Sequence, residues 1–136
     1  MALYRLSVRP VSRTAGRSAV AAASYRAGEK LRNERTRQTY DYTPRGGVDG
    51  AEILAPVHAP AWALDRAQLW NSAESAGTHA NATLAREVLL SLPVELDTAQ
   101  QRGLVRDWVQ QHCVQRGMVA DVAYHGGGTT NPHWRA

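Results

Sequence analysis

Two histidines, His125 and His133, stand eight positions apart around a loop that contains three consecutive glycines. Neutral imidazoles are ligands for divalent metals such as zinc and manganese. If a hairpin brings the two side chains together across its mouth, they supply two arms of a metal site. Histidines beside a loop are also common as surface or hydrogen-bonded residues, so the spacing alone leaves both interpretations open.

A tyrosine on an alanine-rich segment is the second group that could do chemistry. Tyr25 follows Ala21 and Ala22 by four and three positions, which puts small side chains beside it on a helix. A phosphodiester could then approach the phenol, whose hydroxyl can attack phosphorus when a metal polarises the phosphate. Arg26 and Lys30 would offset the phosphate charge. The alternative is a tyrosine that packs its ring against a sheet and keeps its hydroxyl in water.

Glu87 is the third candidate, because it stands at the start of the apolar segment 87–92. A carboxylate in that place could orient a histidine or accept a proton. The alternative is a strand-end charge that faces water.

These groups need a scaffold, and the hydrophobic pattern predicts strands and helices in alternation. Strands are expected at 3–8, ended by Pro10, and at 51–56, 87–92 and 118–125. Helices are expected at 17–27, 62–76 and 97–116, and residues 29–45 are expected to form a loose hairpin or an ordered loop. The order of elements favours an α+β fold, a mostly antiparallel sheet with helices packed against it.

Two of the helices carry clear signals. Gly28 suits the C-terminal cap of the first helix, and Asp97 or Thr98 suits the N-terminal cap of the last. The apolar stripe of the last helix is predicted from a set of four residues: Leu104, Val105, Trp108 and Val109.

The 136 residues are enough for one domain, spanning 1–136, with one core. A single cysteine excludes an internal disulfide, and no apolar run reaches the roughly 20 residues of a membrane span. The first residues show no secretion signal, so we expect a cytoplasmic protein that does not associate with membranes.

The charge is unevenly distributed along the chain. Residues 1–45 contain ten basic and three acidic side chains, whereas residues 46–136 contain six basic and nine acidic ones. Nearly all the basic residues are arginines, whose planar fork suits phosphate groups. The basic third therefore indicates either a polyanionic partner or a solubilising surface.

Several segments together resemble the N-terminal relaxase domain of the MobA/MobL (MobQ-type) conjugative mobilisation proteins, which belong to the HUH endonucleases. The longest is GRSAVAAASYRAGEKL at 16–31, and the lead-in to the metal motif is Asn131-Pro132-His133. The other matching segments are 2–8, 40–42, 52–56, 84–87, 92–93 and 117–121. The resemblance implies a relaxase-like fold and metal-dependent nicking of one DNA strand at a plasmid transfer origin.

The resemblance also implies roles for individual residues. Tyr25 matches the nucleophile that attacks the scissile phosphate and stays attached to the 5′ end, and Glu87 is a weaker catalytic candidate. His125 and His133 match two of three histidines that hold a divalent metal (Mn, Mg or Zn). The expected partners are single-stranded DNA at the transfer origin and accessory mobilisation proteins. The residues expected to contact DNA are Arg13, Arg17, Arg26, Lys30 and Arg32.

The sequence departs from the family pattern beside the second of these histidines. Arg135 stands where the third histidine is expected, and the chain stops at Ala136. Arginine does not lose its proton in proteins and brings positive charge toward the metal. We therefore expect a domain truncated within the metal motif, without the strand that completes its central sheet, and with impaired nicking. A non-catalytic single-stranded DNA-binding module and a poorly folding remnant are the alternatives.

Overall fold

The computed structural model describes residues 6–13, 18–79, 82–125 and, for the backbone alone, 133–135. Its centre is a five-stranded antiparallel sheet in the order β1-β5-β7-β6-β4. The strands are β1 (Leu6–Ser12), β4 (Val48–Leu54), β5 (Thr83–Ser91), β6 (Ala120–His125) and β7 (His133–Arg135). This arrangement confirms the expected α+β fold with an antiparallel sheet.

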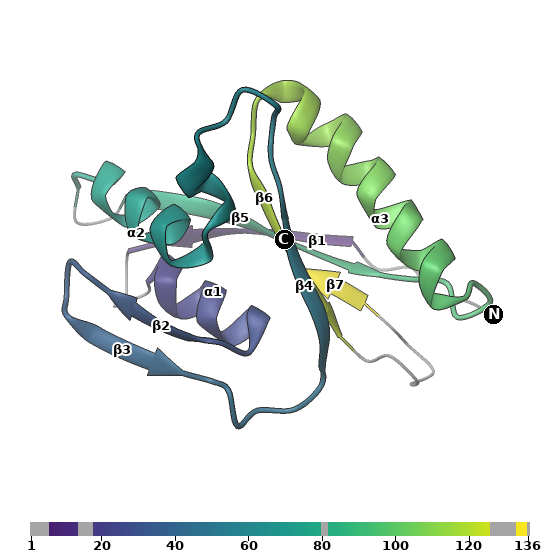
Figure 1. Ribbon diagram of the computed structural model, residues 1–136, viewed down its shortest axis with the longest axis horizontal. Coiled ribbons are helices and arrows are strands. Elements are labelled where there is room, and N and C mark those ends of the chain that lie inside the picture. The colour runs from purple at the N-terminus through teal and green to yellow at the C-terminus, as the bar shows by residue number, and fades with distance from the viewer. Residues whose placement is uncertain (1–5, 14–17, 80–81, 126–132, 136) are drawn as a thin grey trace.

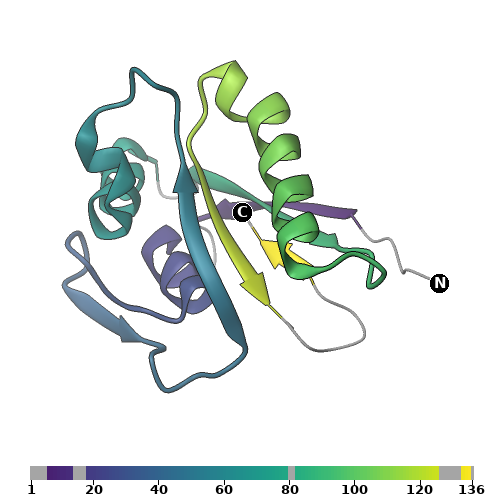
Figure 2. The same ribbon diagram turned by 45° about the vertical axis from the view of Figure 1, so that its right-hand side comes forward.

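Helices cover both faces of this sheet (Figures 1 and 2). On one face lie α1 (Ala19–Ala27) and α2 (Arg66–Ala76), together with a hairpin of β2 (Lys30–Asn33) and β3 (Gln38–Asp41). On the other face lies α3 (Thr98–His112). Two short 3-10 helices, η2 (Ala61–Leu64) and η3 (Val114–Arg116), precede α2 and follow α3.

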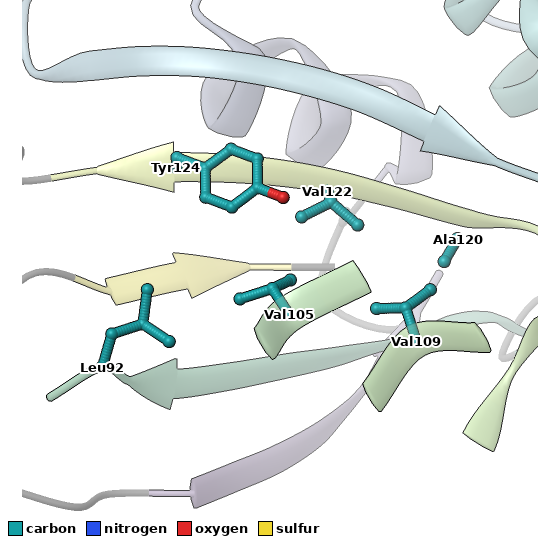
Figure 3. Packing of buried hydrophobic residues seen from close by; sticks show 6 residues of the cluster. All are labelled: Leu92, Val105, Val109, Ala120, Val122 and Tyr124. Carbon is teal, nitrogen blue, oxygen red and sulfur yellow. The ribbon is translucent and has the colours of Figure 1, made fainter. Parts of the chain in front are cut away.

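The face under α3 holds an apolar core, drawn in Figure 3. Alternate residues of β6 point into it and meet Val105 and Val109 of α3. The buried members of this cluster are Leu92, Val105, Val109, Ala120, Val122 and Tyr124. The helix is fixed at its start by a capping box in which Asp97 and Gln100 satisfy each other's backbone N–H groups.

The opposite face is covered by α1, which is short and rich in alanine. Its N-terminus is capped by Ser18, whose side chain accepts a hydrogen bond from the backbone N–H of Ala21. Gly28 ends it in the left-handed conformation, at φ 65°, as the sequence predicts. Ala19, Val20 and Ala23 pack into a second cluster with Leu31 of β2 and Trp70 of α2. The small side chains let α1 lie close to its neighbours.

Several element boundaries differ from the sequence-based expectations. Pro10 lies inside β1, opposite Arg86 of β5, because β1 is an edge strand, where proline is tolerated. β5 begins at Thr83, so Glu87 stands in mid-strand rather than at its start. Leu104 of α3 is exposed and lies outside the predicted stripe, while Val105 and Val109 form it as expected.

The strand expected to be missing from the sheet centre is present over three residues. β7 pairs with β5 on one side and with β6 on the other. The expected loop or hairpin at 29–45 is a hairpin, because β2 and β3 pair antiparallel from Lys30 opposite Asp41 to Asn33 opposite Gln38.

Candidate active site

Tyr25 lies on the outer side of α1 and keeps 40% of its surface exposed. It borders a pocket of about 380 Å³ between α1 and the β1 edge of the sheet. Ala21 and Ala22, one turn earlier on the helix, line the same pocket. The pocket is lined by Arg9, Pro10, Val11, Ser18, Ala21, Ala22, Tyr25, Arg26, Tyr40 and Glu87. Small side chains therefore leave open space beside the phenol, as the sequence led us to expect.

Glu87 reaches this pocket from β5. Its carboxylate forms an ion pair with Arg26 of α1, with Nη2 and Oε2 3.6 Å apart. Arg26 is only 4% exposed, and its guanidinium carbon lies 5.9 Å from the centre of the Trp70 ring. The alternative interpretation of Glu87 as a strand-end charge in water is wrong, because its partner is a buried arginine and its place is mid-strand.

His125, the last residue of β6, is turned toward the same face of the sheet. Val122 and Tyr124 pack under α3, whereas Asp121 contacts α2. Because strand side chains alternate between faces, His125 shares the side of Asp121, the side covered by α1 and α2. His125 is 6% exposed. Tyr25, Glu87 and His125, far apart in the chain, thus lie on one side of the sheet.

The backbone of His133 shows where this residue lies relative to His125. In the antiparallel register, His133 of β7 stands directly opposite His125 of β6 and also opposite Ser91 of β5. The two histidine positions therefore meet across neighbouring strands, as expected from their spacing around the glycine loop. The side chain of His133 lies outside the described part of the structure, as do residues 126–132.

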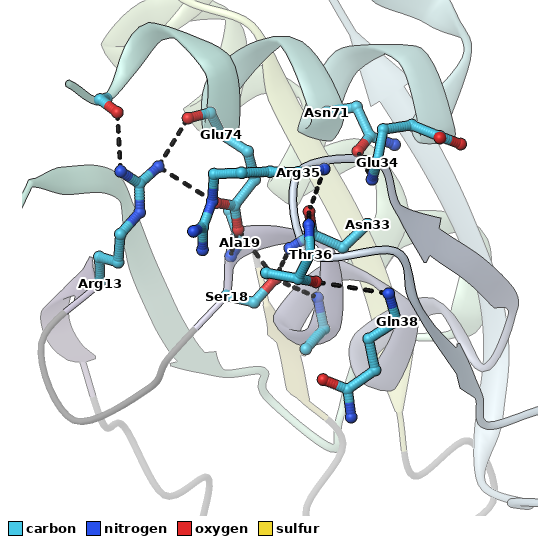
Figure 4. A network of polar contacts seen from close by, with 12 residues as sticks. Arg13, Ser18, Ala19, Asn33, Glu34, Arg35, Thr36, Gln38, Asn71 and Glu74 are labelled. Atoms are coloured by element: carbon cyan, nitrogen blue, oxygen red, sulfur yellow. Dashed lines mark hydrogen bonds and ion pairs between the residues drawn. The ribbon is translucent and has the colours of Figure 1, made fainter. Parts of the chain in front are cut away.

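A buried carboxylate anchors the start of α1 (Figure 4). Glu74 of α2, 1% exposed, accepts hydrogen bonds from the Ser18 hydroxyl at 2.8 Å and from the Ala19 N–H at 2.7 Å. Arg13 and Arg35 form ion pairs with its other oxygen at 3.3 and 3.4 Å. Burial raises the pKa of Glu74, but these donors outweigh it and hold that pKa below its usual range.

A second buried carboxylate ties α2 to β6. Asp121 accepts hydrogen bonds from the Trp70 ring N–H at 2.8 Å and from Arg66 Nε and Nη2 at 2.7 and 2.8 Å. Glu29 pairs with Arg66 Nη1 at 2.6 Å. Burial lowers the pKa of Arg66, but the two carboxylates outweigh it and raise that pKa. The two networks therefore fix both helices relative to the sheet and to each other.

The basic residues predicted to contact DNA fall into different environments. Arg13 donates to the backbone oxygens of Gly77 and Glu74 at 2.7 and 2.6 Å, so its guanidinium is engaged within the protein. Arg26 is buried beside Glu87. Lys30 and Arg32 of β2 are exposed, with Arg32 3.7 Å from Glu34 in a surface ion pair. Arg17 lies outside the described residues.

Sequence analysis missed three residues around the phenol. Arg9 of β1 lines the same pocket. The Arg45 guanidinium lies over the Tyr25 ring, 3.9 Å from its centre, and Tyr42 meets that ring edge-on at 5.2 Å between centres. Tyr42 belongs to a segment that supports the family resemblance, but its spacing gives no role. No periodicity links 42–45 to position 25, because the contact depends on how the hairpin folds back on α1.

Among the side chains in 6–13, 18–79 and 82–125, no cluster of three or more His, Cys, Asp or Glu residues could hold a metal ion. None of the helices in the described ranges is long and apolar enough to cross a membrane.

Comparison with known proteins identifies relatives for this whole arrangement. A model of the MobA/MobL family matches residues 17–135. The mobilization protein MobL of Acidithiobacillus ferridurans is 43% identical over 129 residues, which cover 95% of this chain and 33% of MobL. The conjugal transfer protein TraA of Rhizobium radiobacter is 40% identical, over 98% of this chain and 13% of TraA. The chain thus spans a third or less of the length of these two relatives.

A solved structure is similar in fold as well. It is described as the molecular basis of vancomycin resistance transfer in Staphylococcus aureus, and it matches with a TM-score of 0.92 and 28% sequence identity. The match covers 98% of this chain and 68% of that one. With a family model that matches from 17 to 135 and relatives that share its sequence and fold, the chain belongs to the MobA/MobL family of mobilization proteins.

Proposed function

We propose that this chain is a DNA relaxase domain that nicks one strand of a plasmid at its transfer origin, with Tyr25 as the nucleophile. The observation that carries this proposal is that Tyr25 and Glu87 border one pocket, on the side of the sheet toward which His125 is turned. Membership of the MobA/MobL family supports the same conclusion. The reaction belongs in the cytoplasm, where plasmid DNA is handled.

The proposed step is a transesterification. The Tyr25 hydroxyl oxygen attacks the scissile phosphorus, the bond from phosphorus to the 3′ oxygen breaks, and the 5′ phosphate remains esterified to the tyrosine. The phenol loses its proton as the new bond forms, and the departing 3′ oxygen takes a proton from water. Glu87 borders the same pocket as Tyr25 and is the carboxylate we propose to accept the phenol proton or to orient its acceptor.

His125 and His133 are the residues that would hold a divalent metal. The two histidines stand opposite each other on neighbouring strands, and imidazole is a suitable ligand for Mn or Zn. Water molecules can complete the coordination shell of these ions or of Mg. When bound, the metal supplies Lewis-acid polarisation of the phosphate oxygens. Arg135 stands two positions after His133, where the family resemblance implies a third histidine, so we expect weak metal binding and slow nicking.

The DNA strand is proposed to run along the pocket between α1 and β1. Arg9 lines the pocket, and Lys30 and Arg32 stand exposed on β2. These side chains have charge to offer to phosphates, whereas Arg13 and Arg26 act within the protein as supports for α1. Because phosphate contacts release counterions, DNA affinity should fall steeply as salt rises. Accessory mobilisation proteins are the other proposed partners.

The test compares the wild-type chain with Tyr25→Phe on a supercoiled plasmid that carries the matching transfer origin, with Mn²⁺ or Mg²⁺. The wild-type chain should relax a fraction of the plasmid and form a covalent 5′ adduct at Tyr25. The phenylalanine variant keeps the ring but lacks the oxygen, so the adduct should disappear while single-stranded DNA is bound equally well. An adduct on another residue, or none on the wild-type chain, would contradict the proposal.

Arg135 favours one alternative, a module that binds single-stranded DNA without cutting it. Such a module would bind DNA in the absence of metal and would bind equally with or without the Tyr25 hydroxyl. Substituting Arg135→His separates the two functions: nicking faster than that of the wild-type chain supports the relaxase, and unchanged DNA binding without any nicking supports the module.

A further inference from the structure

A short turn after β3 reaches back to the helix that carries Tyr25. The backbone N–H of Tyr42 donates to the backbone oxygen of Glu29 at 3.2 Å, and the backbone N–H of Arg45 donates to the backbone oxygen of Tyr42 at 3.0 Å. Asp41 accepts hydrogen bonds from the backbone N–H and the hydroxyl of Thr43, at 3.0 and 2.6 Å. These bonds hold the pKa of Asp41 below its usual range, although burial opposes them. The turn is therefore held by its own hydrogen bonds in one conformation.

Both ends of this turn contact Tyr25. The Arg45 guanidinium carbon lies 3.9 Å from the centre of the Tyr25 ring, within the range of a cation–π contact. The same guanidinium donates from Nη1 to the Tyr25 backbone oxygen at 2.8 Å. The Tyr42 ring meets the Tyr25 ring at an interplanar angle of 85°. The turn therefore contacts both the ring and the main chain of Tyr25.

We propose that Arg45, supported by Tyr42, is a positioning residue that fixes the direction in which Tyr25 presents its hydroxyl. A tyrosine with 40% of its surface exposed would otherwise exchange rotamers within nanoseconds. The contacts from Arg45 to the ring and to the backbone oxygen of Tyr25 select one orientation of the ring. This inference rests on the proposed function, because a fixed phenol matters only if that phenol attacks a phosphate.

Misplacing a nucleophile by about 1 Å can cost roughly 100-fold in rate, so the arrangement predicts a split between catalysis and binding. In Arg45→Ala, the first-order rate of adduct formation at saturating DNA should fall roughly 10- to 100-fold. The dissociation constant for the same DNA should change by no more than about threefold, because the Arg45 guanidinium contacts Tyr25 and is not proposed to contact a phosphate. Arg45→Lys keeps a cation but loses the planar fork, so it should recover part of the rate.

The substrate for this test is a set of single-stranded oligonucleotides that tile the transfer origin, with Mn²⁺. Arg116→Ala is the matched control, because it removes one exposed arginine at the end of η3, outside the contacts to Tyr25. It should form adduct at the wild-type rate. A second measurement follows the ring signals of labelled Tyr25 by NMR without DNA: they should shift and average in Arg45→Ala and stay unchanged in Arg116→Ala.

The outcomes separate this inference from the function on which it rests. If the wild-type chain forms the Tyr25 adduct and Arg45→Ala forms it equally fast, Arg45 does not position the phenol. Weaker DNA binding with an unchanged rate at saturation would make Arg45 a DNA contact instead and would overturn the inference as well. If the wild-type chain forms no adduct at Tyr25, the proposed function fails, and the role of Arg45 in the reaction fails with it.

Discussion

The two faces of the five-stranded sheet are packed with different chemistry. Under α3, the buried cluster is apolar except for the hydroxyl of Tyr124, which lies 3.1 Å from Glu52. Under α1 and α2, the apolar cluster around Val20 and Trp70 lies beside a set of buried polar side chains. Among the described residues these include Ser18, Ser24, Arg26, Asn33, Glu74, Asp121 and His125. The candidate site lies on the second face, beside these polar groups.

The difference teaches how the domain divides its tasks. Apolar packing is non-directional, so the α3 face can stabilise the sheet without specifying one orientation of a side chain. Buried charges are costly unless every partner is in place, so the network around Glu74 tolerates few positions of α1. The face that would do the chemistry is therefore the one where geometry is set by hydrogen bonds.

The largest expected effect comes from breaking the polar face at its centre. Glu74→Gln removes the charge that pairs with Arg13 and Arg35, which should destabilise the fold by about 3 kcal/mol in urea unfolding. The lowered pKa of Glu74 means that its contribution is present above its ordinary value of 4.5 and is lost as the pH falls. The variant should therefore lose less stability than the wild type between neutral and acidic pH.

The control for this variant is the same substitution on the surface. Glu34→Gln changes an exposed carboxylate whose ion pair with Arg32 spans 3.7 Å, so the free energy of unfolding should change by less than about 1 kcal/mol. If Glu74→Gln is as stable as Glu34→Gln, the network around Glu74 does not set the position of α1. That result would contradict the proposed difference between the two faces of the sheet.

A smaller effect is expected on the apolar face. Val109→Ala deletes two methyl groups from the centre of the α3 cluster, which should cost about 2 kcal/mol. The cost should be the same from about pH 4 to about pH 9, because Tyr124, the titratable member of the cluster, has its pKa raised to about 12. The exposed Leu104 on the same helix is the control, and Leu104→Ala should change stability by less than about 0.5 kcal/mol. A strong pH dependence of the Val109→Ala cost would break the comparison.

The smallest effect concerns the one hydroxyl in the apolar cluster. Burial, followed by the nearby charge of Glu52, raises the pKa of Tyr124 to about 12. Its neutral form is favoured in the folded state, so its contribution to stability is complete below the ordinary pKa of 10 and is lost as the pH rises through 12. In an absorbance titration of the tyrosines, the component that ionises at the highest pH should disappear in Tyr124→Phe. In Glu52→Gln, the pKa of that component should be lower than in the wild type.

The sequence predicts those elements whose signals are local. The cap at Gly28, the apolar stripe through Val105 and Val109, and the strand that ends at His125 depend on neighbours within a few positions. The meeting of the His125 and His133 positions was expected from their spacing, and the antiparallel register places them opposite each other. Most of the helices and strands could therefore be predicted from residues that are close together in the sequence.

The rest depends on contacts between distant segments. Glu74 resembles any helical surface glutamate in sequence, yet its partners lie 39 to 61 positions away. Arg26, which the family resemblance predicts to contact DNA, lines the pocket beside Tyr25 and pairs with Glu87 of β5, a partner far away in the sequence. Arg45 reaches Tyr25 only because the hairpin folds over α1.

Proline in an outer strand has a consequence for the molecule as a whole. Pro10 lies in β1 at one border of the sheet, and β4 at the other border has an irregular register between Val48 and Gly50. A missing amide donor and a local kink are two of the devices by which proteins discourage strand addition from a neighbouring molecule. Molecules in concentrated samples should accordingly not associate through these outer strands.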